Sequence, residues 1–115
     1  MRFAPSASWE QTIDASGCVA DIRIDPARLD AFRAAARQGI EASVQVEPGV
    51  LVLYAVADRD NPAHVLVFEI YVNVRAYKSH LKTPHLKKSK AATADMVTSL
   101  KLMETDAIML AAKPK

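Results

Sequence analysis

Residues 47–72 read EPGVLVLYAVADRDNPAHVLVFEIYV, and this stretch decides the fold. After a Glu-Pro-Gly breaker come two nearly continuous apolar runs, residues 50–57 and 64–72, which are separated by the polar turn 58–62. Apolar runs of this length, rich in β-branched residues and bounded by turn residues, predict strands. Because the turn is short, the two strands must pair antiparallel as a hairpin. We expect strand 50–57 to be buried on both faces.

The chain before the hairpin predicts one strand and one helix. Residues 18–24 are apolar and β-branched, which indicates a strand. Asp25 can cap a helix and Pro26 suits its first position, since no N–H is needed there. Apolar residues then recur at three- or four-residue steps as far as residue 44, which predicts an amphipathic helix over 26–44.

The chain after the hairpin predicts two helices and a last strand. Asn73 can cap a short helix, and Thr83 followed by proline predicts a second helix that reaches about residue 95. Residues 96–104 have the pattern of a strand. The apolar tail 107–112 is expected either to add a short edge strand or to cross to a partner chain.

The predicted element order is β, α, β, β, α, α, β, which indicates an α+β fold. This order suits a ferredoxin-like antiparallel sheet with its helices on one face. The other face is then left bare, although the central strands are apolar on both faces. We therefore expect a second copy of the chain to cover it, giving a homodimer whose sheets pack together as a dimeric α/β-barrel.

Composition indicates one globular domain. The chain has 115 residues, of which 50% are hydrophobic and 24% charged, and no stretch repeats. We expect a mobile leader over 1–16 and a single domain over 17–113. The net charge of +2 is too small to imply nucleic acid or a membrane surface, and no apolar run has the length of a signal core or membrane span. The lone Cys18 excludes an internal disulfide, so the protein is expected to be cytoplasmic.

Glu69 lies inside a hydrophobic strand and therefore needs a physical explanation. Alternation along the strand places Glu69 and Tyr71 on the same face as Val65 and Val67. An unpaired ionised carboxylate buried there would cost several kcal/mol. The functional interpretation is a pocket between sheet and helices with Glu69 and Tyr71 on its floor. The structural alternative is an ion pair at a dimer seam.

Two histidines, one at the end of the first short predicted helix and one in the first turn of the next, are candidate proton acceptors. His80 and His85 flank Lys82-Thr83-Pro84, so both can lean over the pocket mouth beside Tyr71. Imidazole accepts and returns protons near neutral pH. Each histidine alone is more often a surface or capping residue. No spacing such as two histidines one helical turn apart indicates a metal site, and His64 beside the turn is expected to be solvated.

A basic stretch follows the hairpin. No acidic residue occurs from 75 to 90, and the stretch contains Arg75, Lys78, Lys82, Lys87, Lys88 and Lys90. It can attract an anionic substrate to the pocket entrance, although such runs are usually solvated helix faces. No aromatic platform accompanies the charge, which argues against nucleic acid. Phosphate loops and dinucleotide fingerprints are absent, so an enzyme working without an organic cofactor is expected.

Several short motifs occur together in a characteristic order. They are Glu47-Pro48-Gly49, Asp58-Arg59-Asp60-Asn61-Pro62, Phe68-Glu69-Ile70-Tyr71, Ala76-Tyr77, His80-Leu81 and Thr83-Pro84-His85. Over about residues 17–105 the chain resembles the antibiotic biosynthesis monooxygenase superfamily, particularly its small quinol monooxygenase-like members. The resemblance implies a dimeric ferredoxin-like fold with a pocket between sheet and helices. It also implies oxidation of a phenolic or polycyclic substrate by dioxygen without metal, haem or flavin.

The resemblance specifies the fold better than the reaction. Family members often have aromatic residues where this chain has Leu86 and Ser89, so the pocket lining differs. The superfamily also includes haem-degrading proteins and an isomerase of a phosphorylated sugar.

Three functional hypotheses follow. The first is a cofactor-independent monooxygenase that oxidises a quinol- or anthrone-like aromatic with dioxygen, with Glu69, Tyr71, His80 and His85 as catalytic residues. In it, a histidine or Glu69 removes a phenolic proton and Tyr71 hydrogen-bonds the oxygen on which charge develops. The second is an isomerase of a small phosphorylated carbonyl compound, with the basic stretch holding the phosphate. The third is a non-catalytic dimeric ligand-binding module.

Overall fold

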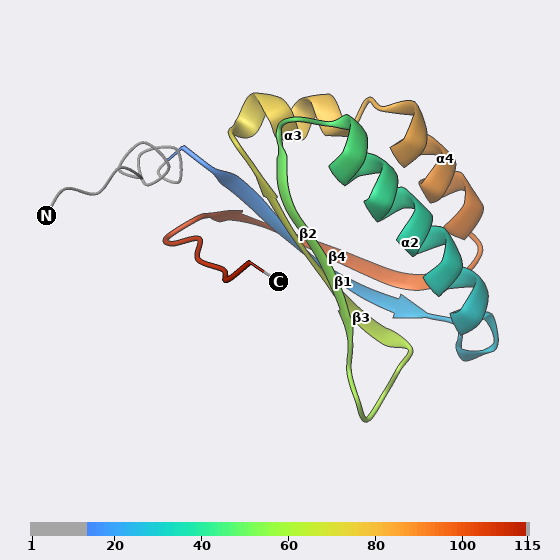
Figure 1. The fold of residues 1–115 in the computed structure, drawn as a ribbon. Helices are drawn as coiled ribbons and strands as arrows, with labels where there is room; N and C mark the ends of the chain where they lie inside the picture. The colour runs from blue at the N-terminus through green and yellow to red at the C-terminus, as the bar shows by residue number, and fades with distance from the viewer. Residues whose placement is uncertain (1–13, 115) are drawn as a thin grey trace, which may run out of the picture.

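The computed structural model describes residues 14–114. Its elements, in chain order, are β1 (Ser16–Ile24), the 3-10 turn η1 (Pro26–Arg28), α2 (Leu29–Val46), β2 (Val50–Ala57), β3 (His64–Tyr71), α3 (Val74–His80), α4 (Pro84–Thr93) and β4 (Val97–Asp106). The four strands form one antiparallel sheet in the order β2-β3-β1-β4, and all helices lie on one side of it (Figure 1). The predicted ferredoxin-like α+β fold is confirmed.

Capping side chains set where the helices begin. The Asp25 side chain accepts a hydrogen bond from the backbone N–H of Ala27 at 3.0 Å. This tight turn makes the first residues a 3-10 helix, so α2 begins at Leu29 rather than at the proline where the sequence predicted it. Asn73 and Thr83 cap α3 and α4 as predicted, each accepting a backbone N–H of the first turn, at 2.8 and 3.4 Å respectively.

Strand register brings polar side chains to the middle of the covered face. Cys18 of β1 pairs with Glu69 of β3 on one side and with Glu104 of β4 on the other. Leu53 of β2 is the partner of Glu69 across the hairpin. Because paired residues point to the same face, Glu69 lies in the interior of the sheet on the helix side.

The main apolar core lies at one end of the molecule. It is formed by the buried side chains of Ile24, Phe32, Val65 and Met96, each at most 7% exposed. These side chains join β1, α2, β3 and the segment before β4. The core therefore fixes α2 against the sheet at one end of the layer between sheet and helices.

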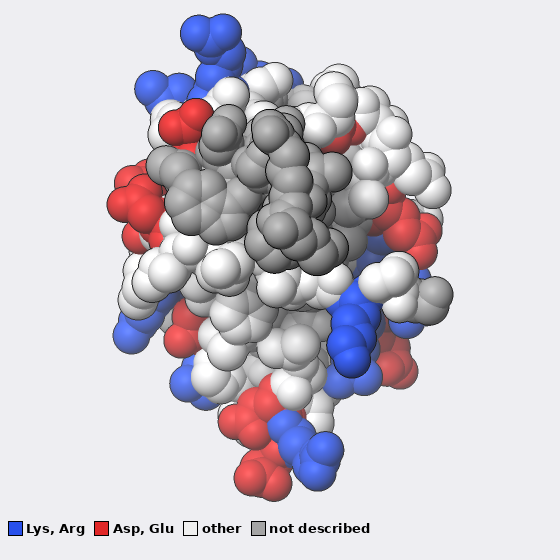
Figure 2. Space-filling view, turned by 60° about the vertical axis from the view of Figure 1, so that its left-hand side comes forward, with Lys and Arg blue, Asp and Glu red and all other residues white. Residues whose placement is uncertain are grey.

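The expectation that strand 50–57 is buried on both faces is wrong for the single chain. β2 lies at the sheet edge, and Tyr54 and Val56 are 58% and 50% exposed. Across the hairpin Tyr54 pairs with Phe68, which is 38% exposed, and both point away from the helices. Figure 2 shows uncharged residues below the centre of the view and many charged side chains toward its rim. The bare apolar face expected from the sequence is thus present; its cover by a second copy stays a prediction.

The two ends of the chain differ in what the structure describes. Residues 1–13 of the predicted leader lie outside the described residues, whereas Ala15 is buried and Ser16 already begins β1. The tail 107–112 adds no strand to this sheet, and Ile108 is 97% exposed. Among the described residues, no helix combines the length and apolarity needed to cross a bilayer.

Candidate active site

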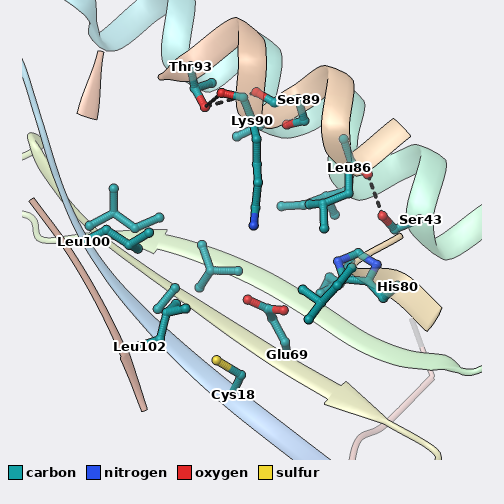
Figure 3. A pocket seen from close by; sticks show the side chains of 18 of the residues that line it. Cys18, Ser43, Glu69, His80, Leu86, Ser89, Lys90, Thr93, Leu100 and Leu102 are labelled. Atoms are coloured by element: carbon teal, nitrogen blue, oxygen red, sulfur yellow. Dashed lines mark hydrogen bonds between the residues drawn. The ribbon is translucent and has the colours of Figure 1, made fainter. Parts of the chain in front are cut away.

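A cavity of about 220 Å³ lies between the sheet and the three α-helices (Figure 3). Its wall is mainly apolar, with Ile22, Phe32 and Leu53 among the lining residues. The polar lining side chains are those of Cys18, Ser43, Glu69, Tyr77, His80, Ser89, Lys90 and Thr93. A cavity of about 150 Å³ can hold benzene, so this one has room for a small aromatic molecule. An apolar pocket with a few convergent polar groups is the usual form of a ligand site.

Glu69 lies on the floor of the cavity, as the sequence predicted, but Tyr71 does not line it. Tyr71 is fully buried, and its hydroxyl donates a hydrogen bond to Oε1 of Glu69 at 2.5 Å. The expectation that Tyr71 faces a ligand therefore needs correction: its ring lies beneath the cavity, packed against Tyr77 and His80 with ring centroids 5.2 and 5.3 Å away.

The environment of Tyr71 keeps its hydroxyl protonated. Burial raises the pKa of Tyr71 far above its ordinary value of 10.0, and the hydrogen bond to Glu69 raises it further. The hydroxyl proton of Tyr71 is used in the hydrogen bond to the Glu69 carboxyl. Tyr71 thus fixes the rotamer of Glu69, and within residues 14–114 Oε2 has no hydrogen-bond partner and can accept one from a ligand.

Glu47, which the sequence analysis treated only as part of a breaker and a motif, joins the two candidate histidines. Its Oε2 lies 2.9 Å from Nδ1 of His80 and 2.5 Å from Nε2 of His85. His80 lines the cavity, whereas His85 lies behind it. The sequence placed both histidines over the pocket mouth beside Tyr71; in the structure only His80 lines the cavity and packs on Tyr71, while His85 bonds to Glu47.

Hydrogen bonding sets the tautomer of His80. Burial alone would raise the pKa of Glu47, but the hydrogen bonds from His85 and His80 outweigh it and hold that pKa below its ordinary value of 4.5. Glu47 is therefore an ionised acceptor at neutral pH, and His80 must donate through Nδ1. When His80 is neutral, Nε2 is its unprotonated nitrogen and can accept a proton from a molecule in the cavity.

A close approach of backbones brings Glu47 to the histidines. The turn after Glu47 packs against α3 so tightly that a Cβ on Gly49 would lie 2.6 Å from Cβ of Ala76. The backbone N–H of Val72 donates to the carbonyl of Gly49 at 2.9 Å. The glycine of the Glu-Pro-Gly motif was the signal that could have indicated this contact, because only glycine allows it.

Glu47, His80 and His85 also form a potential metal-binding set. Their ligand atoms all lie within 4.8 Å of one another. Two histidines and a carboxylate suit several divalent transition metals. The sequence lacked a metal-site spacing because these ligands come from three separate elements. The same distances are typical of hydrogen bonds. Hydrogen bonds from the two imidazoles to Glu47 therefore explain the contacts among the three side chains without a metal ion.

Tyr77 and Lys90 are lining residues that the sequence analysis did not select individually. Burial raises the pKa of Tyr77, and nearby Cys18 and Glu69 raise it further. Tyr77 was mentioned only as a helix residue. Lys90 was one member of the basic stretch, yet the other basic residues of that stretch do not line the cavity.

His64 differs from its predicted solvated state. Its side chain is 19% exposed, and Nε2 lies 2.8 Å from Oδ1 of Asp21 on the neighbouring strand. Neither residue of this pair lines the cavity.

Comparison with known proteins agrees with this architecture. Residues 16–92 match the family described as antibiotic biosynthesis monooxygenase. A solved structure from Bacteroides thetaiotaomicron, described as a member of that family, is 44% identical, covers 90% of this chain and 99% of its own, and has a TM-score of 0.83. One from Lactobacillus acidophilus, described as a monooxygenase, is 27% identical over 80% of this chain and 44% of its own, with a TM-score of 0.78.

A more distant structure shares the fold alone. It comes from Caulobacter crescentus, is 22% identical over 90% of this chain and 99% of its own, and has a TM-score of 0.80. Among proteins of curated function, none matches the sequence. The family match covers more than half of the chain and includes all the residues of the cluster around Glu47. The chain belongs to the antibiotic biosynthesis monooxygenase family.

Proposed function

We propose that this protein is a cofactor-independent monooxygenase that oxidises a quinol- or anthrone-like aromatic with dioxygen. The observation that supports it most directly is a histidine base on the wall of an apolar cavity, His80, whose other nitrogen is bonded to an ionised carboxylate. Family membership supports a monooxygenase in general terms. The quinol-type substrate is our own inference.

The first step is removal of a proton. Nε2 of His80 accepts the proton of a ring hydroxyl, and Glu47 stabilises the imidazolium that forms. His85 holds Glu47 in place through its own hydrogen bond. The product of this step is an electron-rich substrate anion, and the cavity wall keeps bulk water away from it.

The second step is oxygen transfer, in which the substrate itself is the reductant. The anion passes one electron to dioxygen, and the resulting radical pair combines to form a carbon–oxygen bond and a peroxide. His80 returns its proton to the outer peroxide oxygen. The O–O bond and a C–H bond at the same carbon then break, so one oxygen atom remains as a carbonyl and the other leaves as water.

The two other predicted site residues act on the floor of the cavity. Oε2 of Glu69 accepts a hydrogen bond from a second substrate hydroxyl, because Oε1 already accepts one from Tyr71. Tyr71 is therefore a positioning residue rather than a group that touches the substrate. Pre-set hydrogen-bond partners of this kind place the ring hydroxyl within reach of His80.

The alternative of an isomerase acting on a phosphorylated carbonyl compound has weaker support. That hypothesis used the basic stretch as a phosphate cradle. Of its six basic residues only Lys90 lines the cavity, and Lys82, Lys87 and Lys88 are exposed elsewhere. A single ammonium group is a poor match for a phosphate dianion.

Oxygen consumption tests the proposal. The protein is treated with a chelator, its metal content is measured, and menadiol is added under air and under nitrogen. We expect protein-dependent oxygen uptake by the metal-free sample, reduced about 10²- to 10⁴-fold by His80→Ala, as expected for loss of a general base.

The matched control is His64→Gln, which changes a histidine that does not line the cavity and should leave oxygen uptake unchanged. Activity that disappears on chelation and returns with a divalent metal would contradict the cofactor-independent mechanism and assign a metal to Glu47, His80 and His85. No protein-dependent uptake with several quinols would contradict the proposal as a whole.

A further inference from the structure

Lys90 differs from the other lysines of its helix in the direction of its side chain. Its side chain extends from α4 into the cavity (Figure 3). Leu86, Ser89 and Thr93 also line the cavity, and together with Lys90 they form one helical face at spacings of three and four residues. Lys87 and Lys88 are exposed and do not line the cavity, whereas Lys90, which is also exposed, does line it.

The ammonium group of Lys90 lacks a charge partner within the described part of the chain. None of the salt bridges between residues 14–114 includes Lys90. Its ammonium nitrogen lies more than 4.0 Å from every side-chain carboxylate oxygen of these residues, including those of Glu69 on the cavity floor. A positive charge directed into a mainly apolar cavity attracts an anionic group of a bound molecule.

We propose that the substrate carries an acidic substituent, a carboxylate or an equivalent monoanion, which binds to Lys90. This inference rests on the proposed function and makes its substrate class more specific: an aromatic hydroxy acid. The acid group lies at Lys90, below α4, while the ring hydroxyl to be deprotonated lies at His80 on α3. Hydrogen bonds to a charged group are roughly twice as strong as neutral ones, so this contact fixes the orientation of the ring.

The cavity lining favours a ligand with one negative charge rather than two. Among the described residues that line the cavity, Lys90 is the only Lys or Arg, so they include no arginine fork that could bind a phosphate in two places. The Glu69 carboxyl on the floor disfavours additional negative charge nearby. A monoanion satisfies Lys90 without placing excess charge beside Glu69.

Binding of two inert probes tests this inference without turnover. 2-Naphthoate and 2-naphthamide have nearly the same shape and differ in charge. We expect calorimetric titration to show that the native protein binds 2-naphthoate at least about tenfold more tightly. Lys90→Met should remove this preference, and Lys90→Arg should keep it. Lys88→Met, which deletes a charge on the side of the same helix away from the lining residues, should leave it unchanged.

Several outcomes would overturn the inference. These are equal affinity of the native protein for the two probes, binding of neither, or a preference that survives in Lys90→Met. A thermal melt of each variant checks whether a loss of the binding preference is caused by unfolding of the variant. Oxygen uptake separates the two proposals: turnover of neutral quinols as efficient as that of 1,4-dihydroxy-2-naphthoate would contradict only this inference, whereas a carboxylate preference without any oxygen uptake would contradict only the proposed oxygenation.

Discussion

At the scale of single residues, Glu47 determines what the two histidines can do. Its carboxylate accepts from Nδ1 of His80 and from Nε2 of His85, so both rings have a fixed tautomer and orientation. Tyr71 has the same relation to Glu69 on the cavity floor. In both pairs, a residue outside the cavity lining sets the geometry of one that lines the cavity.

Glu47→Gln tests the role of this carboxylate. The amide is uncharged, so it can no longer stabilise the His80 imidazolium that forms during proton removal. We expect kcat for quinol oxidation to fall about 10²- to 10⁴-fold with KM changed little, the range for a disabled acid–base group. The assay is oxygen uptake. Glu41→Gln, on the exposed side of α2, is the control, and equal loss in both variants would contradict the assignment.

Tyr71→Phe tests the buried hydrogen bond through alkaline stability. The pKa of Tyr71 is raised in the folded protein, so its contribution to stability is complete below the ordinary pKa of 10.0 and is lost as pH rises above it. We expect the native protein to be more stable than Tyr71→Phe by about 1–3 kcal/mol at pH 8, with the difference shrinking by pH 11.

Urea denaturation at pH 8, 9, 10 and 11 measures this difference. Tyr54→Phe, at an exposed tyrosine on the bare face of the sheet, controls for the simple loss of a phenol hydroxyl. A Tyr71→Phe curve that runs parallel to the native curve up to pH 11 would refute the linkage.

At the scale of elements, most strands and helices were predictable to within two or three residues. Capping residues and prolines are local signals, so the starts of α3 and α4 follow directly from Asn73 and Thr83. The 3-10 turn before α2 was missed, because its geometry depends on how Asp25 bonds two residues ahead. The packing of the Glu-Pro-Gly turn on α3 was also missed, since turn and helix are more than twenty residues apart.

Gly49→Ala tests this contact between turn and helix. The added methyl group would lie 2.6 Å from Cβ of Ala76, so the turn must move away from α3. We expect a loss of about 1–3 kcal/mol in the free energy of unfolding, together with weaker activity as Glu47 moves away from His80. Urea denaturation and oxygen uptake provide the two measurements.

The compensating change Ala76→Gly offers a direct check of the cause. The double variant removes the methyl group that Gly49→Ala meets, so it should regain part of the lost stability and activity. If the double variant were no better than the sum of the single changes, steric contact at this position would not explain the effect.

At the scale of the whole molecule, the exposed sheet face remains to be explained. Tyr54, Val56, Phe68 and Met103 are all more than a third exposed. Register places the first three on the face opposite the helices. A contiguous apolar surface of this kind on a small domain is typical of an interface, and the predicted occupant is a second copy of the chain.

Phe68→Glu tests the predicted dimer. A carboxylate in the middle of an apolar interface would be buried without a partner, so we expect the mass measured by light scattering to fall from twice 12.6 kDa to 12.6 kDa. Arg33→Glu, on the exposed side of α2, should leave the mass unchanged. A native protein that is already monomeric at high micromolar concentration would rule the dimer out.

The sequence by itself determined the element order, the helix caps and the face of β3 that carries Glu69, because each depends on local propensity or on periodicity along one segment. Only the tertiary structure decided that Tyr71 is covered, that His85 supports rather than lines the site, and that Glu47 joins both histidines. It also decided which lysine of a uniformly basic stretch enters the cavity. These facts depend on distances between segments far apart in the chain, and such distances arise only when the sheet and helices pack together.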